Sequence, residues 1–173
     1  GGSRQGNRTL VRSIGARVRR PRSLRTTRQQ RWERKWEQTT TFPWQVDDVP
    51  PQLDVAVSAG WVPPGGSVLD LGCGEGLSAA WLARRGHPVL RIDFAPTAVT
   101  RARERFGGVP GLAFDVVDVC RPGELADRTF GALVDRGCLS NIHPRLRSAY
   151  AANVASWAIP GAPFLLSMMG RDE

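Results

Sequence analysis

The sequence has few of the residues that disulfide frameworks, zinc sites and membrane spans require. It has only two histidines, and its three cysteines, Cys73, Cys120 and Cys138, are widely spaced without a Cys-x-x-Cys pair. Because zinc sites and stapled secreted domains need clustered or paired ligands, we expect no metal site and reduced thiols in a cytoplasmic protein. No apolar run reaches the ~20 residues that cross a bilayer, so we expect no membrane contact.

Acidic residues are absent from positions 1–31, which hold ten arginines. The rest of the chain carries 14 basic and 16 acidic residues, so the formal net charge of +8 is the sum of +10 and −2. We interpret 1–31 as a basic, flexible N-terminal extension and 32–173 as one domain. A solvated tail, an organelle presequence, a nucleic-acid-binding arm and sequence upstream of the true start all fit its composition.

Strand-like and helix-like segments alternate along residues 65–173, and a Trp-rich segment, 32–64, precedes them. This alternation predicts an α/β fold, with an open, mostly parallel sheet, right-handed crossovers and helices on both faces. The predicted strands are 67–71, 89–93, 112–119, 130–135 and 163–169. The predicted helices are 30–41, 50–60, 77–85, 96–106 and 144–159.

Three glycines at alternate positions, Gly72, Gly74 and Gly76, follow the first predicted strand. Glycine lets the backbone turn sharply and approach a ligand closely, and such a loop at the end of a parallel strand builds a cofactor crevice. A dinucleotide fingerprint would need a glycine where Leu77 stands, and Asp70 would repel the pyrophosphate of NAD. A cationic or zwitterionic ligand therefore fits this loop better.

Two further carboxylates end the next two predicted strands. Asp93 lies about twenty residues past the glycine loop, where an acid can bind two ribose hydroxyls, and Asp118 lies near the end of the third strand. Together with Val68–Gly76, the segments Ile92–Ala95 and Asp115–Asp118 resemble the S-adenosylmethionine-dependent methyltransferases of the Rossmann-like class.

The resemblance implies S-adenosylmethionine as the cofactor. It implies that the glycine loop lies against the methionine part, that Asp93 holds the ribose and that Asp118 with Val119 borders the adenine. The cofactor-binding residues that we expect are Trp36, Trp44, Asp70, Gly72, Cys73, Gly74, Gly76, Asp93, Phe94, Asp118, Val119 and Asp135.

A second resemblance rests on motifs in the Trp-rich segment and at the end of the fourth strand. Trp32-Glu-Arg-Lys-Trp36-Glu, then Phe42-Pro-Trp44, and Asp135-Arg-Gly-Cys-Leu139 are similar to thiopurine S-methyltransferase and its small bacterial thiol-methylating relatives. This likeness implies that Trp36 and Trp44 close over the cofactor, where a tryptophan face attracts a sulfonium; core packing is the alternative.

Family members also add an antiparallel hairpin after the fifth strand, and 170–173 do not supply one. A missing hairpin would leave an apolar fifth strand exposed, and two copies could pair there as a homodimer.

The loop that follows the fourth strand is where substrate meets cofactor in this fold. Its candidate catalytic residues are His143, Asp135 and Arg136. His143 could deprotonate or orient a substrate, or could cap the following helix. Asp135 and Arg136 could contact a polar substrate group, or could form an ion pair that braces the strand end.

The leading functional hypothesis is methyl transfer to a small molecule, with a thiol or another soft nucleophile as acceptor. A nucleic-acid methyltransferase could use the basic extension, but the fourth strand does not end in the Asn/Asp-Pro-Pro-aromatic motif of amino-methylating enzymes. Two further hypotheses are a non-catalytic scaffold with an incomplete pocket and an NAD-dependent oxidoreductase.

Overall fold

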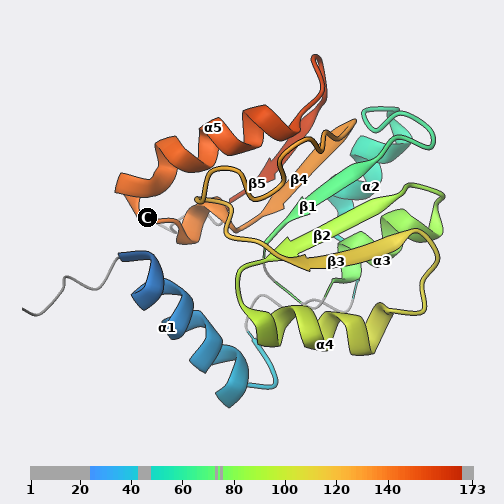
Figure 1. The fold of residues 1–173 in the computed structure, drawn as a ribbon. Coiled ribbons are helices and arrows are strands. Elements are labelled where there is room, and N and C mark those ends of the chain that lie inside the picture. The colour runs from blue at the N-terminus through green and yellow to red at the C-terminus, as the bar shows by residue number, and fades with distance from the viewer. Residues whose placement is uncertain (1–23, 43–47, 73, 75, 169–173) are drawn as a thin grey trace, which may run out of the picture.

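Five parallel strands form a single sheet in the order β3-β2-β1-β4-β5 (Figure 1). The computed structural model describes residues 24–42, 48–72, 74 and 76–168. The strands are β1 (Val68–Leu71), β2 (Val89–Asp93), β3 (Leu112–Val116), β4 (Ala132–Arg136) and β5 (Phe164–Ser167). Leu71 pairs with Ile92 on one side and Asp135 on the other, so the carboxyl ends of the three central strands lie at one edge. The strand order reverses between β1 and β4, the switch point where open α/β sheets bind ligands.

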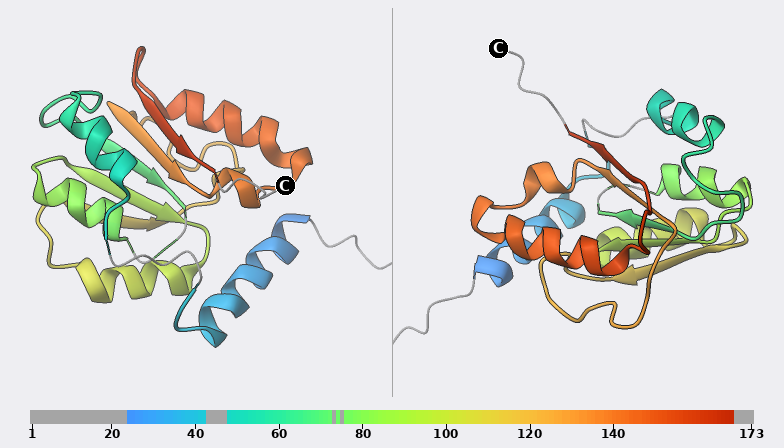
Figure 2. Two further views of the ribbon diagram at one scale, coloured as in Figure 1. Left: turned by 180° about the vertical axis from the view of Figure 1, so that it is seen from behind. Right: turned by 90° about the horizontal axis from the view of Figure 1, so that it is seen from above.

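Helices cover both faces of this sheet, because successive side chains of each buried strand point to opposite sides (Figure 2). Leu69 and Leu71 pack toward Tyr150 and Trp157 of α5. Val68 packs with Leu53 and Leu82 on the opposite face. The helices are α1 (Leu24–Gln38), α2 (Pro51–Ser58), α3 (Leu77–Arg84), α4 (Pro96–Phe106) and α5 (Arg147–Trp157).

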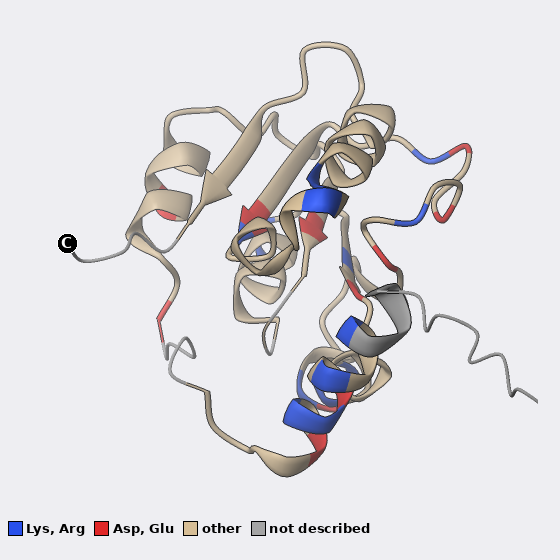
Figure 3. Cartoon of the chain, turned by 90° about the vertical axis from the view of Figure 1, so that its left-hand side faces the viewer, with Lys and Arg blue, Asp and Glu red and all other residues tan. Residues whose placement is uncertain are grey.

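The first helix lies beyond the carboxyl ends of the strands, alongside α4 (Figure 1). A cluster of Trp32, Trp36, Phe42, Ala95 and Ala98 buries its inner side. Its exposed residues include Arg31, Arg34, Lys35 and Glu37, and basic residues outnumber acidic residues along the helix (Figure 3). Apolar contact along one stripe therefore anchors α1 to the domain.

The predicted α/β architecture with a parallel sheet is confirmed, and the differences lie at the ends of elements. The third strand stops at Val116, because the chain turns where the Arg121 N–H donates to the Asp118 carbonyl. The first helix begins at Leu24, so residues 24–31, which we assigned to a flexible extension, are helical. The helix predicted over 144–159 divides into a 3₁₀ turn at Pro144–Leu146 and α5.

An apolar edge strand ends the described part of the sheet. Phe164 and Leu166 of β5 are each 39% exposed, and Met168 beyond it is 51% exposed. Pairing of two copies at this edge stays a prediction, as does the missing hairpin, because residues 169–173 lie outside the described residues. Within the described part of the chain, no helix is both long and apolar enough to cross a membrane.

Candidate functional site

A small, partly open pocket lies at the carboxyl ends of the central strands. Its walls come from the loop after β1, the end of β2, the segment after β3, the loop after β4, and α1. The lining residues are Arg28, Trp32, Gly72, Asp93, Phe94, Val117, Val119, Cys138, Asn141 and Ile142. The pocket therefore lies at the switch point of the sheet, where the sequence predicted a cofactor.

Gly72 allows the loops after β1 and β4 to meet at the pocket. Its φ is +74°, and a Cβ at this position would lie 2.7 Å from both the Cβ and the Sγ of Cys138. Both the backbone conformation and the close approach therefore require glycine here. Gly74 and Gly76 also have positive φ, whereas Cys73, which we expected at the cofactor, lies outside the described residues.

Asp70 lies beneath the glycine loop and not on the pocket wall. Its carboxylate is 3.7 Å from Nε of Arg91, whose guanidinium also donates to the carbonyl of Gly74. Burial raises the pKa of Asp70 to about 6, although the Arg91 charge opposes this rise. Arg91, which sequence reasoning missed, thus ties the carboxylate of β1 to the loop.

Asp93 and Phe94, two of the predicted cofactor-binding residues, lie on the pocket wall at the end of β2. The Asp93 carboxylate is almost fully buried, and its Oδ1 accepts a hydrogen bond from the Ala95 N–H at 2.9 Å. This bond fixes the carboxylate where a ligand with vicinal hydroxyls could meet it. The Phe94 ring supplies a flat apolar surface beside it.

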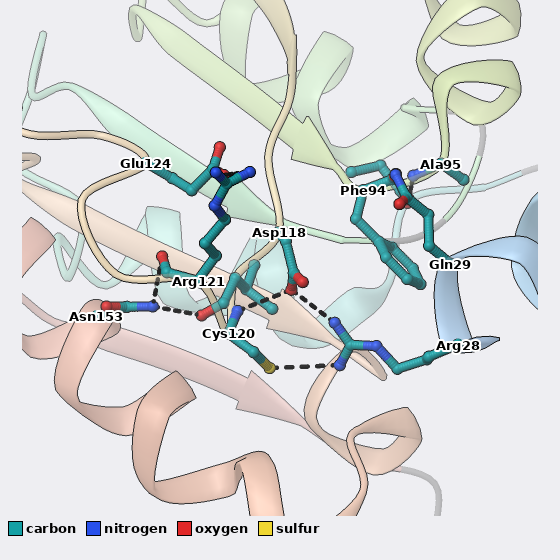
Figure 4. Close-up of polar contacts among 11 residues, drawn as sticks. Arg28, Gln29, Phe94, Ala95, Asp118, Cys120, Arg121, Glu124 and Asn153 are labelled. Carbon is teal, nitrogen blue, oxygen red and sulfur yellow. Dashed lines mark hydrogen bonds and ion pairs between the residues drawn. The ribbon is translucent and has the colours of Figure 1, made fainter. Parts of the chain in front are cut away.

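The segment after β3 brings Val117 and Val119 to the wall and Asp118 beside it. Oδ1 of Asp118 accepts the Cys120 N–H at 2.9 Å and pairs with Nη2 of Arg28 at 2.6 Å (Figure 4). Val119, which the resemblance assigned to the adenine together with Asp118, thus lines the pocket, and Asp118 lies next to it in the chain. Val117 was not predicted, because we read it as an ordinary strand residue.

Asp135 braces the loop after β4. Its side chain is fully buried and accepts hydrogen bonds from the Cys138 N–H at 2.7 Å, the Leu139 N–H at 3.1 Å and the Tyr150 hydroxyl at 2.5 Å. Burial raises the pKa of Asp135, although these hydrogen bonds work against the rise. The carboxylate therefore holds Cys138 and its neighbours at the pocket and does not itself line it.

The other two candidate catalytic residues also lie off the described wall. His143 is exposed, and its Nδ1 accepts the Arg145 N–H at 3.2 Å, which caps the 3₁₀ turn. Arg136 is half-buried at the end of β4. Asn141, by contrast, lines the pocket, with its Nδ2 donating to the Gly137 carbonyl at 2.8 Å.

Of the tryptophans on α1, Trp32 lines the pocket and Trp36 does not. Trp36 is fully buried against Phe42, with 4.4 Å between ring centroids. Trp44 lies outside the described residues. A spacing of four residues placed both tryptophans on one helix face, but it carries no signal for which of them faces the ligand.

Several known proteins are similar to this chain in sequence. A sequence profile of the thiopurine S-methyltransferase family matches residues 27–172. A 2-heptyl-1-hydroxyquinolin-4(1H)-one methyltransferase of Mycobacteroides abscessus is 34% identical over 75% of this chain and 56% of its own length. A thiopurine S-methyltransferase of Pseudomonas putida is 28% identical over 82% of this chain and 72% of its own.

Solved structures share the fold. One, from work on the conversion of a disulfide bond into a thioacetal group during echinomycin biosynthesis, has a TM-score of 0.69 and 27% identity, covering 78% of this chain and 58% of its own. An N-methyltransferase of Bradyrhizobium japonicum in complex with S-adenosyl-L-homocysteine has a TM-score of 0.64 and 20% identity. The match covers 79% of this chain and 71% of that chain.

The chain spans just over half the length of the Mycobacteroides relative. The predicted cofactor class, S-adenosylmethionine, and the predicted family are confirmed by the profile match, which includes most of α1 and all five strands. The chain belongs to the thiopurine S-methyltransferase family.

Proposed function

We propose that this chain forms the catalytic domain of a methyltransferase that acts on a small molecule with a thiol or another soft nucleophile. S-adenosylmethionine supplies an electrophilic methyl group when bound. We assign the ribose to Asp93, the methionine part to the loop at Gly72, and the adenine to the wall formed by Phe94, Val119 and Asp118. The close approach of Gly72 to Cys138, which leaves no room for a Cβ, brings the loops after β1 and β4 together at this wall and supports this assignment.

We infer the type of methyl acceptor from the side chains that line the pocket. Among the described lining residues, the titratable side chains are Arg28, Asp93 and Cys138. Asp93 is assigned to the ribose, and His143 caps a turn outside this wall. An acceptor that depends on a strong general base is therefore poorly served, whereas a thiol that ionises near neutral pH needs little help.

The substrates in the names of two relatives suggest a narrower chemical class of methyl acceptor. A thiopurine and a 1-hydroxyquinolin-4-one are both flat heteroaromatic molecules, one with a thiol and one with an N-hydroxyl group. Trp32 offers this chain a flat aromatic surface at the pocket wall. We therefore propose a planar heteroaromatic acceptor whose S–H or O–H group is acidic. In-line alignment with the methyl group and exclusion of water would then be the main tasks of the protein.

The test is methylation by the protein itself. A thiopurine, a 1-hydroxyquinolin-4-one and an aliphatic amine are each incubated with S-adenosylmethionine, and methylated products are identified by mass spectrometry. We expect product from the thiol or the hydroxyquinolone and none from the amine. Methylation of the amine alone would contradict the proposal of an acceptor with an acidic S–H or O–H group.

A matched pair of variants connects any activity to the site. Asp93→Ala should abolish turnover, whereas Asp115→Ala, which removes an exposed acid from β3, should leave it unchanged. Equal activity of the two variants would mean that the reaction takes place elsewhere. RNA and DNA fragments serve as further acceptors, and methylation of these alone would favour a nucleic-acid methyltransferase.

A further inference from the structure

Arg28 reaches from α1 into the adenine side of the pocket (Figure 4). Its side chain is only 9% exposed, although it stands on a helix whose other described basic residues are exposed. Nη2 is 2.6 Å from Oδ1 of Asp118, and Nη1 donates to Sγ of Cys120 at 3.3 Å. The guanidinium carbon lies 4.6 Å from the centroid of the Phe94 ring. Arg28 thus contacts groups from both the end of β2 and the segment after β3.

These contacts are the kind that an adenine ring would make. A guanidinium is flat, stacks on aromatic faces and donates hydrogen bonds in its own plane. Adenine is also flat and also stacks, and its amino group also donates. Phe94 offers the stacking surface, and Asp118 offers the acceptor. Phe94 and Asp118 can therefore bind either the Arg28 guanidinium or an adenine ring.

The fit of Arg28 to this position is incomplete. Its Nε is buried and has no hydrogen-bond partner among the described residues. A buried donor that has given up water without a replacement raises the free energy of the state that contains it. Desolvation would lower the pKa of Arg28, but the hydrogen bond to Cys120 and the charge of Asp118 outweigh it and raise this pKa. The group therefore stays a cation in the pocket.

The rest of α1 is held without Arg28. Glu33 accepts hydrogen bonds from the Thr97 N–H at 3.1 Å and the Thr97 hydroxyl at 2.5 Å. Gln29 donates to the Phe94 carbonyl at 2.8 Å, and Trp36 is buried in the cluster against α4. Arg28 can consequently swing out of the pocket while the helix stays docked.

We propose that Arg28 occupies the adenine subsite of the free protein, and that the adenine of the cofactor displaces its guanidinium from Phe94 and Asp118. Arg28 then sets the cofactor affinity by competing for the subsite. This inference rests on the proposed function, because it takes the adenine position from that assignment. The competition is confined to the adenosine half of the cofactor.

The first test compares Arg28→Ala with wild type by calorimetric titration. Arg31→Ala is the matched control, since Arg31 is an exposed arginine on the same helix. We expect Arg28→Ala to bind S-adenosylhomocysteine and adenosine about 2- to 5-fold more tightly, the range that loss of one ion pair allows. Arg31→Ala should bind as wild type does. Weaker or unchanged binding by Arg28→Ala would overturn the inference.

The second test follows unfolding and detects a variant that has lost its fold. If the cofactor displaces Arg28, then Arg28→Ala lowers the stability of the free protein but not that of the complex saturated with S-adenosylhomocysteine. A loss of stability that is equal in both states would contradict displacement. Arg28→Lys, which keeps the charge but lacks the flat group, should give intermediate affinity.

Different results would overturn the proposed function and the inference about Arg28. If wild type binds S-adenosylhomocysteine and Asp93→Ala does not, the cofactor site stands, and the Arg28 comparison decides the inference alone. If wild type, Arg28→Ala and Asp93→Ala all fail to bind, the proposed function fails and the inference fails with it.

Discussion

The Tyr150 hydroxyl donates to the carboxylate of Asp135 at 2.5 Å, which joins α5 to the end of β4. Both side chains are buried, and the same carboxylate accepts two backbone N–H groups of the loop that reaches the pocket. One residue pair therefore connects the packing of the domain with the placement of Cys138 and Asn141. Hydrogen bonds to a charged group are among the stronger ones in proteins.

Tyr150→Phe should destabilise the fold by about 1.5–3 kcal/mol, because a buried carboxylate loses a hydroxyl donor that no water replaces. Urea denaturation measures the change, with the exposed α5 substitution Ser148→Ala as the control. S-adenosylhomocysteine affinity should fall as well, since the loop at Cys138 is less firmly held. Unchanged stability would mean that the pair contributes nothing to the fold.

Asp70 should make the protein less stable as pH rises. Its pKa is raised by burial to about 6, above the ordinary 3.8, so the folded state binds more protons than the unfolded state between these values. The unfolding free energy should therefore fall from pH 4 to pH 6, by at most about 1.4 kcal/mol per pH unit from this group. Asp70→Asn should flatten this slope. An equal slope in both proteins would assign the dependence to another group.

Gly72→Ala should disrupt both fold and cofactor affinity. The new Cβ would meet Cys138 at 2.7 Å, and φ of +74° adds backbone strain. Gly86→Ala is the control, because Gly86 has φ of +88° but no atom within 4 Å of its Cβ position. We expect about 1 kcal/mol of strain alone at Gly86 and a larger loss at Gly72. Cys138→Gly should restore part of the loss at Gly72; no restoration would contradict the steric account.

Substitution of the two tryptophans of α1 should have different effects, one mainly on the stability of the fold and the other mainly on cofactor affinity. Trp36→Phe removes buried volume from the cluster with Phe42 and should lower stability by about 1–3 kcal/mol, with little effect on cofactor affinity. Trp32→Phe should weaken S-adenosylhomocysteine binding more, because this ring lines the pocket. Titrations and denaturation curves on both variants check this division. The reverse pattern would place Trp36 at the cofactor, as the sequence resemblance implied.

Short-range patterns explain what could be predicted from the sequence. Gly72 follows the first apolar strand and Asp93 ends the second, so the strand pattern and the motif together place them at the same edge of a parallel sheet. The alternation of strands and helices likewise predicts the crossovers. These features depend on neighbours along the chain, which the sequence displays directly.

The features that were missed depend on contacts between distant segments. Arg28 pairs with Asp118 ninety residues away, and nothing around Arg28 distinguishes it from the arginines that precede it. Asp135 looked like a candidate catalytic acid until Tyr150, fifteen residues on, supplied its partner. Arg91 did leave a signal: a charged residue inside an apolar strand, beside a strand that also carries an acid, predicts a buried ion pair.

The most direct test of the central claim is a calorimetric titration of this chain with S-adenosylhomocysteine, with NADH in parallel and Asp93→Ala as the second protein. The account predicts micromolar binding of S-adenosylhomocysteine to wild type, at least tenfold weaker binding to Asp93→Ala, and no binding of NADH. Equally tight binding of S-adenosylhomocysteine to both proteins would contradict a cofactor site at the carboxyl ends of β1 and β2, and binding of NADH alone would contradict S-adenosylmethionine as the cofactor.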